Sequence, residues 1–541
     1  MSLISVAGLT FAYEGSYDNI FENVSFQIDT NWRLGFTGRN GRGKTTFLNL
    51  LLGKYEYQGI IAASVDFDYF PFSVEDLSRE TWQVAMDVNP QCELWQLQRE
   101  LHLLDVEEEV LYRPFVTLSH GERTKVLLAV LFLQENAFLL IDEPTNHLDA
   151  KARRVLGQYL SRKKGFLLVS HDRQLLDACV DHILSINKTD IQIQKGNFSS
   201  WWENKERQDQ HEMAENERLK KDIGRLTAAA RQSKNWADKV ESGKIGFDPR
   251  KDTDRSVDTR AYMGEKSRRM QQRRKNLERR QNAAIEEKSS LLKNIETAED
   301  LKLFPQKHHK QDLVMCEGLS LWYGDPSRDT SAKDADSQYT DTKDKMVLDH
   351  WHLTVRQGER IALQGRNGCG KSSVLKAILA VHGHEGAQAA LDRSGDTLDG
   401  AGHGSGSTLQ IHGQIQLASH LKISYVSQDT SDLKGDLSAY AARYGVEEHI
   451  FKALLRKLDF SRVQFEKPME DYSEGQKKKV LIARSLCEQA HLYIWDEPLN
   501  YIDVLSRMQI EQLILTYEPT LLFVEHDGAF TETIATRIVE M

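Results

Sequence analysis

The stretch GRNGRGKTT, residues 38–46, recurs later in the chain as GRNGCGKSS, residues 365–373. Each copy follows an apolar segment that predicts a buried strand, and each fits the pattern G-x-x-x-x-G-K-[ST]. Glycines at these positions let backbone N–H groups curl around phosphate oxygens, and the N-terminus of the following helix adds positive potential. The repeat therefore predicts two sites for nucleotide phosphates.

Two further motifs repeat in the same order. They are LIDEPTNHLD at 140–149 with IWDEPLNYID at 494–503, and LVSHD at 168–172 with FVEHD at 523–527. The copies are offset by 327 residues for the first motif and by 354 for the other two, so the second copy contains extra residues. We therefore expect homologous α/β domains at 1–197 and 311–541, and a region of different composition at 198–310.

The repeated residue types suit phosphoryl transfer, which depends on positioning and charge stabilisation. Lys44 and Lys371 can reach the β- and γ-phosphates, while Thr45 and Ser372 can offer a hydroxyl to Mg²⁺. Each copy then has two carboxylates and a histidine after apolar strands. We expect the aspartates to hold Mg²⁺, the glutamates to polarise the attacking water and the histidines to meet the γ-phosphate: Asp142, Glu143 and His171, and Asp496, Glu497 and His526.

A third pair of motifs points to a family. TLSHGERTKVLLA at 117–129 and DYSEGQKKKVLIA at 471–483 resemble the signature of ATP-binding cassette (ABC) ATPases. The resemblance implies tandem cassettes with mixed sheets that pair head to tail within one monomer. Each ATP would then lie between the phosphate loop of one cassette and the signature of the other.

The resemblance assigns residues to both ATP sites. Ser473 and Gly475 would face the ATP on Lys44, and Ser119 and Gly121 would face the ATP on Lys371. Tyr13 and Tyr323 would stack on adenine, with plain core packing as the alternative. The remaining expected contacts are Gly38, Asn40, Gly41, Gly43, Thr45 and Thr46 in the first copy, and Gly365, Asn367, Gly368, Gly370, Ser372 and Ser373 in the second.

One departure separates the two sites. The family's loop glutamine, an expected Mg²⁺ contact, is present as Gln428, whereas the matching position of the first cassette is Phe72. Both catalytic glutamates remain. We therefore expect two competent sites that hydrolyse ATP at unequal rates.

The region between the cassettes is charged and helical in pattern. Apolar residues recur at three- and four-residue spacing near 219–230 and every seventh residue between 270 and 291, which predicts two helices. Loss of this pattern at 233–264 predicts a loop, with the tip at about 240–262. The sequence thus predicts a helical hairpin as the interdomain linker.

Positive charge concentrates in this hairpin. Residues 221–280 contain 18 Lys/Arg and 9 Asp/Glu in a chain of net charge −10, and 266–280 hold eight Lys/Arg and one Glu. A solvated helix face is one explanation. A basic probe for RNA is the other, since phosphate contacts are electrostatic. Candidate RNA contacts are Phe247, Tyr262, Arg268, Arg269, Arg273 and Arg274.

Two cassettes joined by such a hairpin resemble the ABC-F family of translation factors, and within it the antibiotic-resistance branch of the Lsa and Vga kinds. The resemblance implies an ATPase that binds the ribosomal exit site and touches 23S rRNA and peptidyl-site tRNA. Its linker would protect the ribosome from lincosamides, pleuromutilins and streptogramin A compounds. A housekeeping ABC-F factor that relieves stalled ribosomes is the main alternative.

Other classes fit less well. No run of about 18 apolar residues exists to span a membrane, although an ATPase subunit of a membrane transporter stays as an alternative. Five scattered cysteines without a CxxC motif predict free thiols in the cytoplasm and argue against zinc or an iron–sulfur cluster. The Gly/Ser/Asp-rich stretches 324–346 and 382–410 predict surface insertions of the second cassette.

Overall fold

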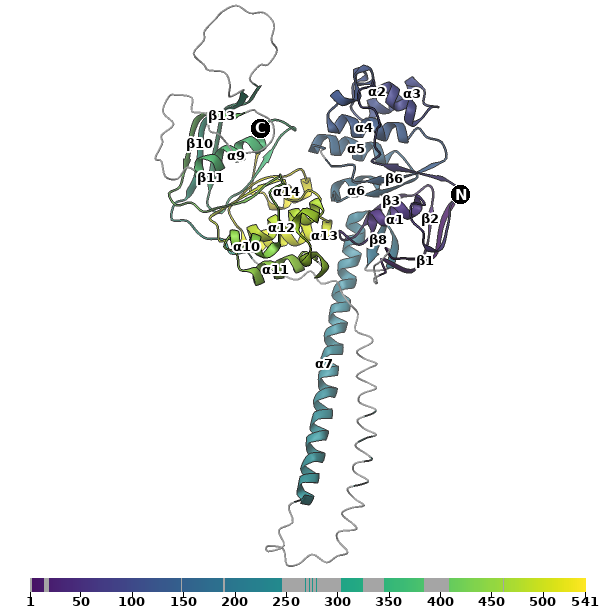
Figure 1. Cartoon of the computed structure of the whole chain (residues 1–541), viewed down its shortest axis with the longest axis vertical. Coiled ribbons are helices and arrows are strands. Elements are labelled where there is room, and N and C mark those ends of the chain that lie inside the picture. The colour runs from purple at the N-terminus through teal and green to yellow at the C-terminus, as the bar shows by residue number, and fades with distance from the viewer. Residues whose placement is uncertain are drawn as a thin grey trace, which may run out of the picture. The chain divides into compact units, whose positions relative to one another are not determined.

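The computed structural model describes residues 2–13, 19–146, 148–187, 190–245, 303–324, 345–383, 408–460 and 462–541, and the single residues 268, 272, 275 and 279. It divides into two compact units, Met1–Ser199 with Ala298–Met541, and Ser200–Thr297. Both predicted cassettes belong to the first unit. The elements of each cassette can be followed in Figure 1.

The first cassette contains two sheets. An antiparallel sheet has the order β2-β1-β4, and a larger sheet has the order β5-β6-β7-β3-β8-β9, in which only the β8–β9 pair is antiparallel. The strands are β1 (Leu3–Phe11), β2 (Phe21–Asp29), β3 (Arg33–Thr37), β4 (Gln58–Ala62), β5 (Asp66–Phe70), β6 (Ala137–Asp142), β7 (Phe166–Val169), β8 (His182–Asn187) and β9 (Asp190–Lys195). The helices are α1 (Lys44–Leu51), α2 (Thr81–Val88), α3 (Leu94–Leu103), α4 (His120–Leu131), α5 (Ala150–Ser161) and α6 (Arg173–Cys179), with short turns η1 (Glu108–Tyr112) and η2 (Phe115–Thr117).

The second cassette repeats this plan, with an antiparallel sheet β11-β10-β13 and a parallel sheet β14-β15-β16-β12-β17. Its strands are β10 (Asp312–Gly324), β11 (Lys345–Arg356), β12 (Arg360–Gln364), β13 (Thr408–Leu417), β14 (Ile423–Val426), β15 (Leu492–Asp496), β16 (Leu521–Val524) and β17 (Arg537–Glu540). Its helices are α9 (Lys371–Gly383), α10 (Leu437–Arg443), α11 (Glu448–Lys457), α12 (Glu474–Cys487), α13 (Val504–Tyr517) and α14 (Gly528–Ile534), with η3 (Arg462–Glu466) and η4 (Met469–Asp471). The α/β class with mixed sheets is confirmed.

The repeated motifs lie at the carboxyl ends of parallel strands, and these strands are buried on both faces. Strands β7 (FLLV) and β16 (LLFV) are buried at every position, as expected for parallel strands that are covered on two sides. The carboxyl ends of β3, β6 and β7 lie at one edge of their sheet, and those of β12, β15 and β16 lie at one edge of theirs. The motif residues of each cassette therefore meet at that edge.

Each phosphate loop requires glycine immediately before its helix. Gly43 and Gly370 have φ of 94° and 104°, in the left-handed region that favours glycine. A Cβ at Gly43 would stand 2.5 Å from the Ile20 side chain, and one at Gly370 would stand 2.7 Å from Val347. Any larger residue would therefore push the loop off the strand that it packs against.

The second unit contains all but the first two residues of α7 (Phe198–Ile245), a helix of 48 residues. The predicted helix break at residue 233 is wrong, because α7 continues to Ile245. Residues 198–248 contain no proline, and Gly243 costs only about 1 kcal/mol in a helix. Pairs at i,i+4 spacing support the exposed surface: Lys205–Asp209, Arg207–Glu203 and Lys221–Glu217. Of the predicted second helix only residues 268, 272, 275 and 279 are described, each as helical, and most of the tip loop and of both insertions lies outside the described residues.

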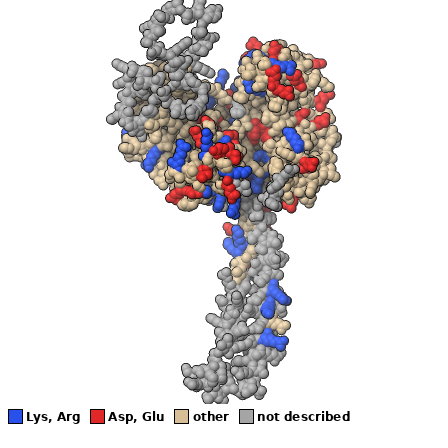
Figure 2. Space-filling view, viewed as in Figure 1, with Lys and Arg blue, Asp and Glu red and all other residues tan. Residues whose placement is uncertain are grey.

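The described surface of the cassettes carries both signs of charge, with Lys and Arg interspersed among Asp and Glu in Figure 2. All five cysteines are unpaired, as predicted, and none lies within a disulfide. Among the described helices, none combines the length and the apolar character that crossing a bilayer would need.

Candidate functional site

Both phosphate loops fold around the lysine that follows them. Lys44 Nζ donates to Gly38 O at 2.7 Å and to Asn40 Oδ1 at 3.1 Å. Lys371 Nζ donates to Gly365 O at 2.9 Å. Burial lowers the pKa of Lys44, against the opposing effect of nearby carboxylates. The backbone carbonyls stabilise this buried ammonium only in part. A bound phosphate would supply the anionic partner that it lacks.

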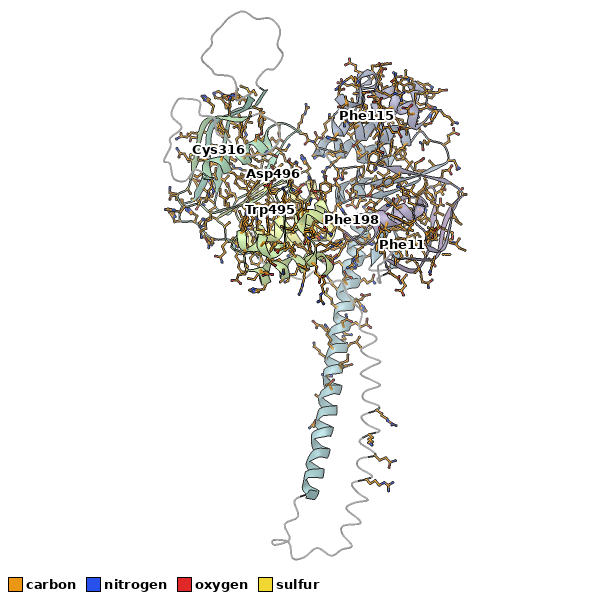
Figure 3. The ribbon with its side chains drawn as sticks, in the orientation of Figure 1. Phe11, Phe115, Phe198, Cys316, Trp495 and Asp496 are labelled. Atoms are coloured by element: carbon orange, nitrogen blue, oxygen red, sulfur yellow. The ribbon has the colours of Figure 1, made fainter. Side chains whose placement is uncertain are left out.

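The hydroxyl that follows each lysine meets the aspartate at the end of β6 or β15, a parallel strand that one strand separates from β3 or β12 in the same sheet. Thr45 Oγ1 donates to Asp142 Oδ2 at 3.1 Å, and Ser372 Oγ donates to Asp496 Oδ1 at 2.9 Å. Asp496, next to the buried Trp495 in Figure 3, ends β15.

These oxygen pairs fit Mg²⁺. Asp496 Oδ2 is buried without a hydrogen-bond partner, and burial raises the pKa of Asp142 and raises that of Asp496 to about 6. A hard cation would offset both costs. Among the described residues, no cluster of three or more His, Cys, Asp or Glu side chains could hold a metal by itself. Magnesium commonly takes one or two carboxylates and completes its shell with substrate phosphates and water.

The two catalytic-glutamate candidates occupy matching strained positions. Glu143 follows β6 with φ of 50°, and Glu497 follows β15 with φ of 47°. Such left-handed backbone in a non-glycine residue costs on the order of 1–3 kcal/mol and concentrates at functional sites. His171 Nε2 lies 3.3 Å from Glu143 Oε1, and His526 Nε2 lies 3.4 Å from Glu497 Oε1. The structure therefore brings each predicted glutamate and histidine together.

The electrostatics of these glutamates differ. Burial, assisted by the Asp142 charge, raises the pKa of Glu143 to about 8. Burial also acts to raise the pKa of Glu497, but the hydrogen bond and charge of His526, the Lys478 charge and the Asn500 amide outweigh it and lower the pKa overall. At neutral pH these shifts favour the ionised form of Glu497 and the protonated form of Glu143. The second site therefore has the environment that better suits a general base.

This difference predicts opposite pH profiles. In a Glu497→Gln variant, turnover comes from the first site, and kcat/KM should rise several-fold between about pH 6.5 and 9, because Glu143 ionises as the pH passes its pKa near 8. In Glu143→Gln, kcat/KM should be flat over this range, because the pKa of Glu497 lies below its usual value. Steady-state ATPase assays across this range provide the measurement, and a flat profile for Glu497→Gln would contradict the assignment.

The predicted signature serines begin helices. Ser119 caps α4 and Ser473 caps α12, each in a capping box with Glu122 or Gln476 three residues later. The N-termini of these helices are therefore already stabilised by the protein itself. Their exposed first turns can present backbone N–H groups to a phosphate.

The second signature lies against the first phosphate loop. Asn40 Nδ2 donates to Tyr501 O at 2.7 Å, and a Cβ at Gly475 would stand 2.5 Å from that carbonyl and 3.4 Å from Asn40 Nδ2. The charges of Asp503 and Lys479 also act on the pKa of Lys44. The geometry thus combines parts of both cassettes at the first site, as the ABC resemblance implied.

The second phosphate loop has different surroundings. Gly365 and Lys371 border a cavity of about 790 Å³, whose other side includes Arg153, Gly157 and Gln174 of the first cassette. The first signature is not part of this lining. An ABC-type site at Lys371 therefore requires further approach of the first cassette.

The hydroxyls of the two tyrosines expected to stack on adenine contact the helices that follow the phosphate loops. Tyr13 OH and Thr46 Oγ1 lie 2.8 Å apart, and Tyr323 OH and Ser373 Oγ lie 3.0 Å apart. Tyr13 is also 43% exposed and packs edge-on against Tyr55. A hydroxyl anchor with an exposed ring suits stacking on a base better than core packing.

The loop-glutamine position has different surroundings in the two cassettes. Gln428 Nε2 donates to Glu497 Oε2 at 2.8 Å. In the first cassette, Phe72 stands at the matching position and has no polar group to offer, while Tyr69 OH donates to Asp142 Oδ2 at 3.2 Å.

Sequence reasoning missed several charged residues behind the sites. Lys478, Lys479, Asp503, Arg507 and Asp527 are buried and pair with one another or with loop carbonyls. Buried charge within a signature helix was visible as the KKK of residues 477–479, but their partners lie far away in the sequence. Of the predicted RNA contacts, Arg268 alone is among the described residues; Phe247, Tyr262, Arg269, Arg273 and Arg274 lie outside them.

Two phosphate loops, each followed by a strand-end Asp-Glu pair, a histidine and a signature helix, define a tandem ATPase of the ABC type. The sequence model of the family described as ABC transporter matches residues 21–146 and 348–500, more than half of the chain. The chain therefore belongs to this family, and it is an ATPase.

Relatives span nearly the whole chain. Ribosome protection protein VmlR of Bacillus subtilis (strain 168) is 26% identical over 96% of this chain and 84% of that protein. Probable ATP-binding protein YbiT of Escherichia coli O157:H7 is 23% identical over 96% of this chain and 93% of that protein. The archaeal ribosome recycling factor aABCE1, solved with the ribosomal stalk protein aP1, matches with a TM-score of 0.56 at 18% identity, over 98% of this chain and 87% of that one. The structural likeness shows the fold alone.

Proposed function

We propose that this ATPase is an ABC-F translation factor that binds the ribosomal exit site when both of its nucleotide sites hold ATP. The observation that carries the proposal is the pairing of two complete cassettes with the 48-residue helix α7. At 1.5 Å per residue this helix is about 70 Å long, which is long enough to cross much of a ribosomal tRNA site. Similarity to a ribosome protection protein over 96% of the chain supports the proposal, because that alignment includes most of the region between the cassettes.

The residues would divide the work as follows. The phosphate loops and their lysines bind the phosphates, the tyrosines stack on adenine, and the signature helix of one cassette closes on the ATP of the other. Bound Mg²⁺, held by the hydroxyl–aspartate pairs and by Gln428 in the second site, would supply charge neutralisation for the phosphates. Glu143 and Glu497 orient the attacking water, and the neighbouring histidines hold these carboxylates in place.

Within this family, the proposed role is ribosome protection. The linker, with its net charge of +9 over residues 221–280, would reach 23S rRNA and the peptidyl-site tRNA. Its tip would disturb the sites of lincosamides, pleuromutilins and streptogramin A compounds. The tip residues are assigned from the sequence, with Phe247 and Tyr262 as stacking candidates and the four arginines as phosphate contacts.

A ribosome-pelleting experiment tests ribosome binding. The Glu143→Gln/Glu497→Gln double variant should bind ATP without hydrolysing it, so most of the protein should sediment with ribosomes in ATP and little should do so in ADP. Lys44→Ala/Lys371→Ala, which removes the phosphate contacts, provides the matched negative control. Sedimentation that is equal in ATP and ADP, or association with membranes in place of ribosomes, would contradict the proposal; the second result would favour a transporter subunit.

A susceptibility assay separates protection from a housekeeping role. Expression in a drug-sensitive host should raise the inhibitory concentrations of the three drug classes, and shortening 240–262 should abolish the rise while ATPase activity persists. Unchanged susceptibility with normal ribosome binding would favour the housekeeping factor. Among the relatives, YbiT bears only the name of an ATP-binding protein, so the alignments leave both roles open.

A further inference from the structure

The signature helix α12 serves one ATP site at its N-terminus and touches the other along its length. Its first turn lies against the first phosphate loop, where a Cβ at Gly475 would stand 3.4 Å from Asn40 Nδ2. Its next residues lie against the segment that carries Gln428, the loop glutamine of the second site. A single rigid element therefore contacts both nucleotide sites.

Two side chains fasten α12 to this glutamine segment. Lys478, which is 2% exposed, donates from Nζ to Ser427 O at 2.9 Å. Thr430, which is 7% exposed, donates from Oγ1 to Glu474 Oε2 at 2.7 Å. The two bonds flank Gln428 on either side in the sequence, so they fix the loop relative to the first two turns of the helix.

The flanked glutamine reaches the catalytic carboxylate. Gln428 Nε2 donates to Glu497 Oε2 at 2.8 Å, although the residue itself is exposed. An exposed amide can adopt several rotamers, so its position depends on the backbone that carries it. A small shift of Ser427 and Thr430 would therefore move the group that orients Glu497.

The first cassette has no equivalent of either bond. Thr124 stands where Lys478 stands in the second copy, and threonine has no ammonium group. Val74 and Phe72 match Thr430 and Gln428, and neither has a polar side chain. A generic folding requirement of ABC cassettes would call for these groups in both copies. Their presence in one copy points to a role specific to the second site.

We propose that Lys478 and Thr430 are positioning residues that couple closure of α12 on the first ATP site to the placement of Gln428 in the second. ATP bound at the first site attracts the N-terminus of α12 and displaces the helix toward that site. The two hydrogen bonds transmit this displacement to Gln428, which lies beside Glu497. Hydrolysis at the second site then depends on occupancy of the first. This inference rests on the assigned roles of Glu143 and Glu497 and is independent of the ribosome.

Turnover of the second site alone provides the test. In a Glu143→Gln parent, Lys478→Met and Thr430→Val should each lower kcat about tenfold, the scale expected when a catalytic group is misplaced by a fraction of an ångström to one ångström. KM for ATP should stay within about twofold, because the phosphate loop and Tyr323 are untouched. Lys478→Arg, which keeps the charge and the donor, should recover most of the activity.

Matched controls come from the same cassette. Lys452→Met removes an ammonium that pairs with the exposed Glu448 of α11, and Thr533→Val removes a hydroxyl that donates to Ala529 O. Both should retain the parental kcat. A loss equal to that of Lys478→Met would mean that any such change weakens the cassette, and would overturn the proposal.

Coupling itself is measured by a double-mutant cycle. Lys44→Ala empties the first site and should lower second-site kcat about tenfold in the parent, but should add less than about twofold when Lys478→Met and Thr430→Val are present. Additive losses would overturn the coupling while leaving the assignment of the glutamates intact. If Glu143→Gln and Glu497→Gln both leave wild-type turnover, the assignment of the glutamates fails, and the coupling fails with it.

Discussion

The Glu497→Gln variant is expected to lose about nine-tenths of its ATP turnover at pH 7, whereas Glu143→Gln should keep more than about half. The environments of the two carboxylates explain the difference. Glu497 accepts hydrogen bonds from Gln428 and Asn500, at 2.8 and 2.7 Å, and its pKa is lowered overall, so it is ionised and oriented. Glu143 has a pKa raised by burial to about 8, and its Oε1 is buried without a hydrogen bond of good geometry.

The measurement is steady-state hydrolysis by the two single variants at saturating ATP. Equal losses would contradict the asymmetry. A matched gain-of-function variant provides a second test. Phe72→Gln in the Glu497→Gln background gives the first site an amide equivalent to that of Gln428 in the second site. It should raise first-site turnover several-fold, since an oriented amide beside Glu143 would favour its ionised form. No gain would show that the missing glutamine does not limit the first site.

The difference between the two ATP sites also affects the order in which they hydrolyse ATP. A fast second site that senses the first through Lys478 and Thr430 would hydrolyse only after both nucleotides are bound. The slow first site would then set how long the two cassettes stay engaged. For a factor that acts while bound to a large partner, such an order would prevent futile hydrolysis before engagement.

The local parts of these sites could be predicted because short motifs dictate them. The glycines of 38–46 allow the positive φ angles that a tight phosphate loop needs, and in such a loop Lys44 contacts Gly38. The contact of Ser372 with Asp496 is consistent with the rule that the parallel strands of one sheet end at one edge. Repetition of each motif made chance an unsatisfactory explanation.

The remaining features depend on contacts that no local pattern encodes. Lys478 donates to Ser427, a residue 51 positions away, and Asn40 donates to Tyr501 across 461 positions. Only the folded backbone brings these residues together. The loss of apolar periodicity after residue 233 predicts a loop, but α7 continues to Ile245, because a solvated helix needs no apolar stripe when charged pairs and helix-forming residues support it.

Replacing Arg507 by methionine is expected to destabilise the second cassette by about 3–5 kcal/mol, the cost of leaving a buried charge without its partner. Arg507 is 6% exposed and donates to Asp527 Oδ2 at 2.8 Å, to Leu499 O at 3.0 Å and to Ile502 O at 2.9 Å. Asp527 is fully buried and also caps α14. The variant would leave this carboxylate without its cationic partner and remove the Arg507 bonds to the carbonyls of Leu499 and Ile502 in the loop that follows Glu497.

Arg153→Met in the first cassette provides the matched comparison. Arg153 stands at the equivalent position and makes fewer bonds, to Asp172 at 3.3 Å and to Leu148 O at 3.0 Å, and its side chain is slightly more exposed. It should cost about half as much. Hydrogen exchange of amides in β15 and α13, read against those in β6 and α5, assigns each loss to its cassette.

A double replacement distinguishes a stranded charge from lost packing. Arg507→Met with Asp527→Leu removes both charges, so it should recover about half or more of the loss caused by Arg507→Met alone, because apolar groups of similar volume can replace a buried ion pair. No recovery would mean that the two carbonyl contacts carry the stability. The Arg507 charge also lowers the pKa of Glu143, so Arg507→Met should move the first-site pH profile further upward, while the second-site profile stays flat. A shifted pH profile at the first site together with a loss of stability in the second cassette would show that the loop after Glu497 affects both.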